Sequence, residues 1–368
     1  MPTDGPSESP AAPFPYLRWA KAHLSWEDLD PGAICLGMSG LEPLDAADRA
    51  ALGLPPPPEV GPAVHGLKAA LATRYDVTPD HVHLAAGTSH ANFIAYLALA
   101  KGGSVAVEEP AYEALHRLTD AVGAARTTFR RQPARGWRLD HASLADAVDD
   151  RTDLIVLTDL HNPSGLRLEP EDLDAVVALA ERHDAHVLVD EVYADFDPVE
   201  RPSAVHRSPR VVVTNSLTKV HGLPDLRAGW ILGAPEVIER IDAWDDLVHP
   251  GLPPDPMVAA ARFVPQARDR LADLRSRAAA RAAQVDAWVA SQPRVSWSLP
   301  HGGITGFLFL DGLDGDAVAR AAWEQSQVRI VPGRFFQVDE ALRVSFLLPE
   351  DELARALDGI AQALESVA

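Results

Sequence analysis

Residues 154–193 read LIVLTDLHNPSGLRLEPEDLDAVVALAERHDAHVLVDEVY, and their pattern sets the architecture we expect for the chain. Two short aliphatic runs, Leu154–Thr158 and His186–Val189, have the length and the valine content of buried parallel strands. Between them, Glu169–His183 has helical spacing, with Pro170 well placed in its first turn. This order of strand, helix and strand predicts an α/β domain.

The same alternation continues on both sides of this segment, from about residue 64 to about residue 232. Short apolar runs again alternate with longer segments of helical spacing. We therefore expect a large domain with a mostly parallel central sheet flanked by helices. The additional expected strands are His81–Ala86, Ser104–Glu108 and Val211–Asn215, and the additional expected helices are Ser89–Ala100 and Tyr112–Val122.

After about residue 235 the pattern changes. Residues 256–291 are rich in Ala, Arg and Asp, with no internal Pro or Gly beyond Pro265, which predicts one long or kinked helix. The segments that follow predict a smaller α+β domain. Its expected strands are Val295–Ser298, Gly306–Phe309, Val328–Val331 and Leu342–Phe346, and its expected helices are Asp316–Gln325 and Asp351–Val367. We expect a mobile tail over residues 1–13, a large domain over 41–250, and a small domain from 14–40 plus 251–368.

The composition of the 368 residues excludes several classes of protein. The chain has 53 acidic and 33 basic residues, which argues against nucleic-acid binding because phosphates recruit Lys and Arg patches. The one cysteine, Cys35, rules out an internal disulfide and a thiolate-rich metal site. No apolar run approaches the roughly 18 residues of a membrane helix, and no secretory signal is visible. We expect a cytoplasmic protein without a metal, a membrane or a nucleic acid as partner.

Polar and aromatic residues follow each expected strand of the large sheet. In parallel sheets of this kind, ligands bind beyond the carboxyl ends of the strands. Taken singly, each residue also fits an ordinary cap, turn or surface position. Asp190 would suit a nucleotide hydrolase only beside a GxxxxGK[ST] loop, which this chain lacks. The segments are Gly87-Thr88-Ser89, Glu109–Tyr112, Asp159–Gly165, Asp190–Tyr193 and Ser216–Lys219.

The order of these segments resembles that of the class I/II aminotransferase family, which belongs to the fold type I enzymes that depend on pyridoxal phosphate. The combination of Ser-x-x-Lys…Arg with Asn-Pro-Ser-Gly and Asp-Glu-Val-Tyr is specific, and the resemblance spans roughly residues 85 to 350. The matching segments are AAGTSHANF (85–93), EEPAYEAL (108–115), HNPSG (161–165), VDEVYADF (189–196), SLTKVHGLPDLRAGW (216–230), VPGRFF (331–336) and LRVSF (342–346).

The resemblance implies that Lys219 forms a Schiff base with pyridoxal 5'-phosphate. A desolvated amine beside cationic groups has a lowered pKa, so it can serve as nucleophile and then as base for the α-proton. Asp190 matches the carboxylate that keeps the pyridine nitrogen protonated. Asn162 and Tyr193 match the donors to the phenolic oxygen of the ring. Tyr112 matches the aromatic residue that stacks on the ring.

The resemblance also implies a phosphate site at the start of the helix after the first strand. Gly87, Thr88 and Ser89 match the residues whose backbone N–H groups and hydroxyl point at the phosphate oxygens, where the helix dipole adds positive potential. Ser216 and Arg227 complete this site, because a guanidinium binds phosphate in bidentate fashion.

Substrate binding is implied for three residues. Arg343 matches the arginine that grips the substrate α-carboxylate, and the small domain is expected to close the pocket because Arg343 lies there. The other two residues for which substrate binding is implied are Asn162 and Gly37. Gly37 lies in a segment that is only loosely like the family's glycine loop. Val60 stands where many relatives have a tyrosine that reaches the phosphate of the neighbouring subunit.

The implied activity is transfer of an amino group between an L-amino acid and a 2-oxo acid, by a homodimer with active sites at its interface. No residue separates this from a pyridoxal-phosphate C–S lyase or a related eliminating enzyme. A cofactor-binding protein without turnover is the alternative from another class. A plain nucleotide-binding protein is a third, and the lack of an early GxGxxG counts against it. The open candidates for contacting the substrate side chain are Trp19, His90, His221 and Arg334.

Overall fold

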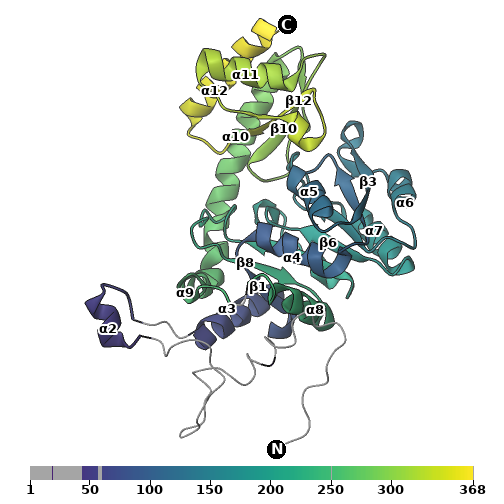
Figure 1. The fold of residues 1–368 in the computed structure, drawn as a ribbon. Helices are drawn as coiled ribbons and strands as arrows, with labels where there is room; N and C mark the ends of the chain where they lie inside the picture. Colours follow the sequence, from purple (N-terminus) through teal and green to yellow (C-terminus); the bar gives the residue numbers. More distant parts are fainter. Residues whose placement is uncertain (1–18, 20–43, 57–59, 250, 368) are drawn as a thin grey trace, which may run out of the picture.

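The computed structural model describes residues 19, 44–56, 60–249 and 251–367, and it contains a large and a small sheet joined by a long helix (Figure 1). In chain order, the strands of the large sheet are β1 (Val82–Ala85), β2 (Ser104–Glu109), β3 (Ala125–Gln132), β4 (Arg138–Leu139), β5 (Leu154–Thr158), β6 (His186–Asp190), β7 (Val211–Ser216) and β8 (Gly229–Leu232). Their order in space is β1-β8-β7-β6-β5-β2-β3-β4. Strands β7, β6, β5, β2 and β3 are parallel, whereas β8 is antiparallel to both of its neighbours.

Helices cover both faces of the large sheet. One face carries α4 (Thr88–Ala100), α5 (Glu113–Ala121) and α8 (Pro235–Asp245), and the other carries α3 (Val60–Tyr75), α6 (His141–Ala147), α7 (Pro170–Arg182) and α9 (Pro254–Phe263). Side chains of each strand alternate between the two faces, as the pleat of a strand requires. In β5, Leu154 and Val156 pack in the core under α4, while Ile155 and Leu157 pack in the core under α3.

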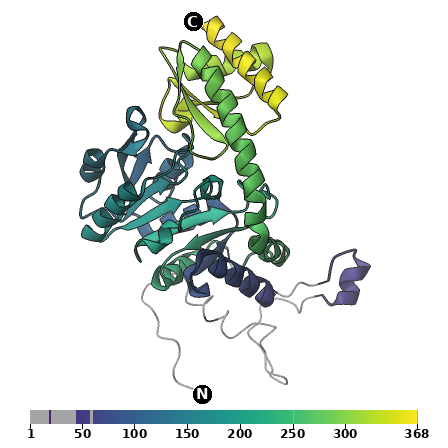
Figure 2. The same ribbon diagram turned by 180° about the vertical axis from the view of Figure 1, so that it is seen from behind.

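The small domain is an antiparallel sheet covered by helices. Its strands are β9 (Val295–Ser296), β10 (Thr305–Leu310), β11 (Val331–Pro332) and β12 (Ala341–Ser345), in the order β11-β12-β10-β9, and its helices are α11 (Gly315–Ser326) and α12 (Glu350–Val367). Helix α10 (Leu271–Ser291) runs from the large domain to this sheet (Figure 2). Its Leu271 packs beside the large domain and its Val285 and Val289 belong to the core of the small domain. One continuous helix therefore ties the two cores together.

An aromatic cluster joins the two domains beside the loop that follows β5. Trp137 of the large domain lies 6.0 Å from Phe307 and 5.1 Å from His161, measured between ring centroids. Phe307 in turn lies 5.8 Å from Phe336. Trp137, Phe307 and Phe336 are buried. Such tilted and edge-on pairs add to the stabilisation that comes from burial alone.

The mostly parallel sheet and the smaller α+β domain are confirmed, and the differences lie in single elements. Strand β8 was not expected although its four residues are all buried. Strand β3 was not expected, because only Phe129 and Arg131 of its eight residues are buried. The segment Val328–Val331 was wrong as a strand, since only Val331 and Pro332 pair with β12. The expected kinked helix over 256–291 is two helices, α9 and α10, separated by 3₁₀ turns that contain Pro265.

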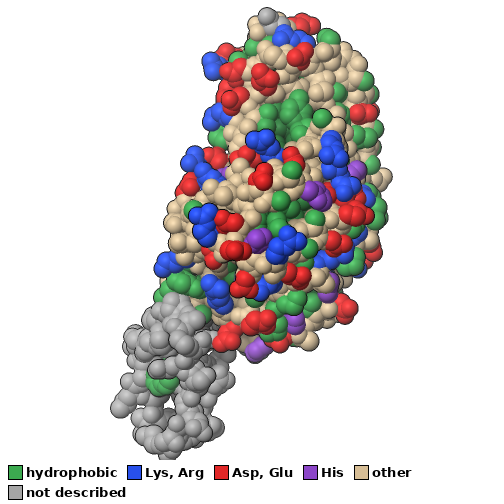
Figure 3. Space-filling model, turned by 90° about the vertical axis from the view of Figure 1, so that its right-hand side faces the viewer, with side chains coloured by type: hydrophobic (Ala, Val, Ile, Leu, Met, Phe, Trp, Pro, Cys, Tyr) green, Lys and Arg blue, Asp and Glu red, His purple; other side chains and the backbone are tan. Residues whose placement is uncertain are grey.

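The predicted domain boundaries stay predictions. Residues 1–13 and most of 14–40 lie outside the described residues, and α9, which follows the expected boundary at 250, packs against α3 of the large domain. On the face shown in Figure 3, acidic and basic side chains are interspersed over the surface. No helix in the described ranges is long and apolar enough to cross a membrane.

A shorter helix, α2 (Ala46–Ala51), lies away from both sheets (Figure 1). The side chain of Asp45 caps it by accepting hydrogen bonds from the N–H groups of Ala47 and Asp48, both over 2.8 Å. Such a cap satisfies orphan donors of the first turn. None of the residues of α2 is buried, so this helix adds nothing to the two cores.

Candidate active site

The residues singled out after the strands lie at one edge of the large sheet. Strands β1, β2, β5, β6 and β7 run in the same direction, so their carboxyl ends meet there. Asp190 and Ser216 are the last residues of β6 and β7. Tyr112, Asn162 and Lys219 follow the ends of β2, β5 and β7 by three or four residues. The topology thus brings together residues that are far apart in the sequence.

Asp190 is a buried carboxylate held by neutral donors. Asn92 Nδ2, on α4, donates to Asp190 Oδ2 over 2.9 Å, and the N–H of Val192 donates to Oδ1 over 3.0 Å. Asn92 is itself held, because Thr214 Oγ1 on β7 donates to Asn92 Oδ1 over 2.6 Å. Burial raises the pKa of Asp190 to about 6, although these hydrogen bonds and the charge of Lys219 oppose the rise. A cation placed against Asp190 would keep it ionised.

Lys219 lies in the turn after β7, close enough for its charge to lower the pKa of Asp190. Its side chain is exposed, so the described residues of one chain do not supply the desolvation that we expected for this amine. Lys219 forms no ion pair with another described residue. Its amine is therefore available to a ligand.

The loop that carries Asn162 is anchored by a buried ion pair. Arg131 Nε on β3 donates to Glu108 Oε2 on β2 over 2.6 Å, and both side chains are fully buried. Thr158 donates to the same carboxylate through its N–H and its hydroxyl, each over 2.6 Å, and its hydroxyl accepts from the N–H of Asn162 over 3.2 Å. The Oδ1 atom of Asn162 is buried without a partner among the described residues.

Tyr193 lies within reach of a charge on the small domain. Burial raises the pKa of its hydroxyl, the guanidinium of Arg343 opposes the rise, and Asp190 and Tyr112 add to it. Three other predicted site residues therefore lie within electrostatic reach of Tyr193. Arg343 comes from β12, its Cζ lies 5.6 Å from the ring centroid of Phe336, and its Nε has no hydrogen-bond partner in the described part of the chain.

An anion cup, formed by Gly87, Thr88, Ser89, Ser216, Thr218 and Arg227, lies where α4 begins. Thr88 Oγ1 donates to Ser216 Oγ over 2.8 Å, and Ser216 Oγ lies 2.7 Å from Thr218 Oγ1. The first N–H groups of a helix lack partners in their own helix and attract anions. A Cβ added at Gly87 would lie 2.5 Å from Nη2 of Arg227, so only glycine lets the guanidinium approach this closely.

Other predicted residues have different surroundings. His221 is buried, with its Nε2 2.9 Å from Asp195 Oδ2. Arg334 pairs with Asp316 over 2.8 Å in the small domain. Trp19 is exposed, and His90 lies beside α8. Gly37 and the side chain of Val60 lie outside the described residues, so their predicted roles stay predictions.

Sequence reasoning missed three residues of this site. Asn92 sits inside a helix pattern, and nothing local marks it as a partner of Asp190. Glu108 looks like the end of an apolar strand. Thr218 lies beside Lys219 within a matched segment, and its hydroxyl in the Ser-Leu-Thr-Lys sequence is a signal that could have found it.

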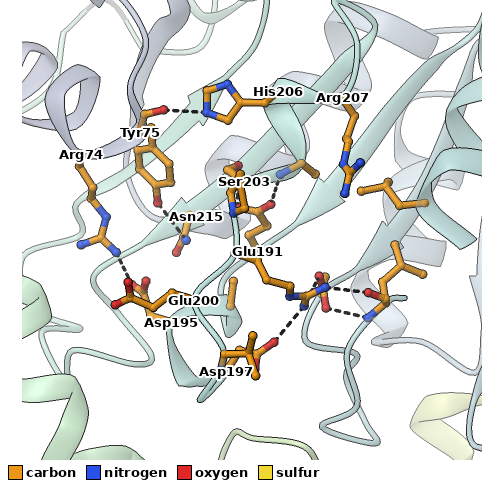
Figure 4. Close-up of a pocket in the computed structure, with 18 of the residues that line it drawn as sticks. Arg74, Tyr75, Glu191, Asp195, Asp197, Glu200, Ser203, His206, Arg207 and Asn215 are labelled. Carbon is orange, nitrogen blue, oxygen red and sulfur yellow. Dashed lines mark hydrogen bonds and ion pairs between the residues drawn. The ribbon is translucent and has the colours of Figure 1, made fainter. Parts of the chain in front are cut away.

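A cleft of about 780 Å³, the back cleft, lies behind this edge of the sheet (Figure 4). It is lined by Arg74 and Tyr75 of α3, by Glu191 and by the loop that follows β6. Figure 4 shows these side chains linked to one another across the cleft. Lys219, Asp190 and Arg343 do not line it.

Comparison with known proteins agrees with this geometry. A family model described as aminotransferase class I and II matches residues 56–360. Capreomycidine synthase from Streptomyces vinaceus is 29% identical over 306 residues, which cover 81% of this chain and 78% of that protein. Arginine–pyruvate transaminase from Pseudomonas aeruginosa is 26% identical over 71% of this chain and 68% of that protein.

Solved structures share the fold. A PLP-dependent aminotransferase from Streptococcus suis superimposes with a TM-score of 0.77 at 23% identity, covering 82% of each chain. Aspartate aminotransferase from Thermus thermophilus with maleate gives a TM-score of 0.76 at 22% identity, covering 81% of each chain. These likenesses confirm the expected fold type I architecture.

Proposed function

This chain belongs to the aminotransferase class I and II family, and we propose that the residues at the carboxyl edge of its large sheet form the active site. It is a transaminase that depends on pyridoxal phosphate and moves an amino group between an amino acid and a 2-oxo acid. The observation that supports our choice of site is the convergence of Lys219 and Arg343 on the segment that carries Asp190 and Tyr193. The charge of Lys219 lowers the pKa of Asp190, and the charge of Arg343 lowers that of Tyr193.

The described residues fit pyridoxal phosphate. Lys219, Arg227 and Arg343 form no ion pair with another described residue, so three cations are available for anionic groups of a cofactor and a substrate. The anion cup offers hydroxyls and a helix start to a phosphate. The Nδ2 group of Asn162 can donate to a phenolic oxygen, and Asp190 is a buried carboxylate that a cation would stabilise. Each polar part of the cofactor therefore has a complementary group.

We assign the steps to this chain's own residues. When bound, pyridoxal phosphate supplies an aldehyde that reacts with amines and a ring that takes up electrons from the substrate α-carbon. Lys219 Nζ holds the cofactor and later moves the proton of the α-carbon. Asp190 Oδ2, oriented by Asn92, holds a proton on the ring nitrogen. Tyr193 and Asn162 hold the phenolic oxygen, and Tyr112 covers the ring.

Substrate binding follows from the position of Arg343. Its planar guanidinium binds a carboxylate in bidentate fashion, which selects α-amino acids and 2-oxo acids. Arg343 lies on the small domain, so a bound carboxylate connects the two domains. We infer that a substrate closes the pocket by this contact.

A second candidate function rests on the match to capreomycidine synthase, since that relative is named as a synthase and not as a transaminase. Our site contains the same lysine and carboxylate that an eliminating or cyclising reaction would need. Product analysis separates the two functions. A transaminase converts an added 2-oxo acid into a new amino acid, whereas an α,β-eliminating enzyme releases ammonia without needing an acceptor.

Borohydride reduction tests the proposed site directly. The chain has four lysines, Lys21, Lys68, Lys101 and Lys219, so the labelled position is unambiguous by peptide mass. We expect the cofactor to be trapped on Lys219, and Lys219→Ala to lower transamination about a thousandfold or more. Lys101→Ala, at a lysine that stacks on Trp244, is the matched control and should behave as wild type. Labelling of Lys68 or Lys101 instead would refute the site.

We also propose a homodimer, in keeping with the family. Tyr112 is 47% exposed, and Lys219 and Arg227 are exposed, in the single chain. A second subunit that covers them would supply the missing desolvation. Light scattering of the purified protein should then give twice the 39.6 kDa of one chain, and a monomeric active enzyme would contradict this.

A further inference from the structure

His90 accepts a hydrogen bond from the backbone of the turn before α4. The N–H of Ala86 donates to His90 Nδ1 over 3.1 Å. Nδ1 is therefore the acceptor atom of this ring. Its Nε2 lies 2.9 Å from Asp245 Oδ1 on α8. The ring thus stands between the turn and α8.

Asp245 is an ionised anchor for His90. Its other oxygen, Oδ2, lies 3.1 Å from Nε2 of His83, and Nδ1 of His83 lies 2.5 Å from Asp242 Oδ1. Burial alone would raise the pKa of Asp245, but the two histidines lower it to about 2. The ring of His249 lies 5.6 Å from that of His90. The charge of Asp245 therefore lies against Nε2 of His90, although neither this atom nor Asp245 Oδ1 has a hydrogen-bond partner among the described residues.

The opposite side of the same turn holds Arg227. The carbonyl of Ala86 accepts from Arg227 Nη2 over 3.0 Å. Arg227 has a φ of +46°, a left-handed conformation that is costly for a residue with a side chain. The guanidinium also lies against Gly87, where no Cβ would fit. The position of Ala86 therefore determines where the guanidinium of Arg227 lies in the anion cup.

We propose that His90 is a positioning residue for the cofactor phosphate, acting through Ala86 on Arg227. The inference rests on the proposed function, since it takes the anion cup as the phosphate site. His90 itself touches neither cofactor nor substrate. By accepting from Ala86, its Nδ1 atom holds the turn in a position from which both Arg227 and the N-terminus of α4 can contact an anion in the anion cup.

Two matched variants test this role. In His90→Asn, Oδ1 takes the place of Nδ1 and can accept from Ala86, whereas in His90→Gln the amide reaches toward Asp245 and the acceptor is lost. The cofactor-free protein is titrated with pyridoxal phosphate and, separately, with pyridoxal, which lacks the phosphate. Visible absorbance reports binding, and thermal unfolding without ligand reports folding.

We expect His90→Gln to weaken pyridoxal phosphate binding about three- to tenfold, the effect of one lost hydrogen bond, and His90→Asn to stay within about twofold of wild type. Pyridoxal binding should be the same in all three proteins. Equal losses for both ligands, or equal losses in both variants, would overturn the inference. A wild-type protein that binds neither ligand would instead overturn the proposed function.

Discussion

Asp190 and Glu191 are neighbours in the sequence, yet they lie on opposite faces of the large sheet in different surroundings. Asp190 bonds to Asn92 of α4, and Glu191 lines the back cleft near Tyr75 of α3. Both are buried, and burial raises their pKa values to about 6 and about 7. Each carboxylate accepts two hydrogen bonds from neutral donors, so the two differ in the charges nearby. The charge of Lys219 lowers the pKa of Asp190, whereas those of Asp159 and Asp195 raise the pKa of Glu191.

The back cleft is filled with charges that have partners. Ser203 Oγ and the N–H of Ala204 donate to Glu191 over 2.9 and 2.7 Å. Arg74 pairs with Asp195 over 2.5 Å, and Arg201 with Asp197 over 3.0 Å. The carboxyl edge of the large sheet differs, because its three cationic residues form no ion pair with another described residue. These residues are Lys219, Arg227 and Arg343. This difference in available charge supports the carboxyl edge of the large sheet as the proposed active site.

The largest expected effect comes from substituting the two neighbours. Asp190→Asn removes the charge that would hold the ring nitrogen protonated, so kcat should fall about a hundred- to ten-thousandfold. Glu191→Gln makes the matched change on the other face, where nothing reacts, and kcat should change less than about threefold. Steady-state kinetics at saturating cofactor measures both. Equal losses of kcat in the two variants would show that the two carboxylates do not differ in their contribution to catalysis.

A smaller effect is expected at Arg343, which we propose binds the substrate carboxylate. Arg343→Lys keeps the charge but loses the bidentate fork, so KM for the amino acid should rise one to two orders of magnitude, roughly, with a lesser fall in kcat. Arg207→Lys is the control, because Arg207 lines the back cleft and pairs with Asp174 near the surface. Amino-acid titrations at fixed oxo acid give both constants. A KM that stays at the wild-type value in Arg343→Lys would remove this residue from the site.

The smallest effect concerns stability and pH in the cofactor-free protein. A carboxyl with a raised folded-state pKa binds more protons in the folded chain, so its stabilising contribution falls as pH rises from its unfolded to its folded pKa. For Asp190 that window runs from 3.8 to about 6, and for Glu191 from 4.5 to about 7. Each carboxyl therefore makes the free energy of unfolding of wild type decrease between pH 5 and 8. In Asp190→Asn this decrease should be smaller by about 1 kcal/mol, and in Glu191→Gln by about 2 kcal/mol.

Urea unfolding at the two pH values measures these differences, with wild type as the reference. A variant that lost as much stability as wild type between pH 5 and 8 would mean that its carboxyl has no raised pKa in the folded chain. The experiment also shows whether the two faces of the sheet titrate independently, because the double variant should then show the sum of both effects.

Sequence patterns predicted what depends on local order. Aliphatic runs located β2, β5, β6 and β7, since buried parallel strands have strong local signals. The place of Asp190 and Lys219 at one edge of the sheet could be predicted from these strands, because residues at the carboxyl ends of parallel strands collect at one edge. Arg343 depended on the resemblance alone, since one arginine on a short antiparallel strand has no local mark. Its role stays a prediction.

The rest depended on contacts between distant segments. Asn92 and Thr214 are separated by 122 residues, and only the packing of α4 on β7 brings them to Asp190. Strand β3 is a largely polar strand near the sheet edge, where exposure removes the alternating pattern that predicts a strand. The exposure of Lys219 could not be read from its neighbours in the sequence, because burial is a property of the assembled fold.

Helix α10 has a mechanical consequence. It has 21 residues, so at 1.5 Å per residue it is a lever about 30 Å long. Its base is seated beside the large domain, and the sheet that carries Arg343 is packed at its far end. A tilt of about 10° at the base would move that end by roughly 5 Å, by the same helix geometry. A small rotation of this helix would thus move the partly buried guanidinium of Arg343 by several ångströms relative to the large sheet.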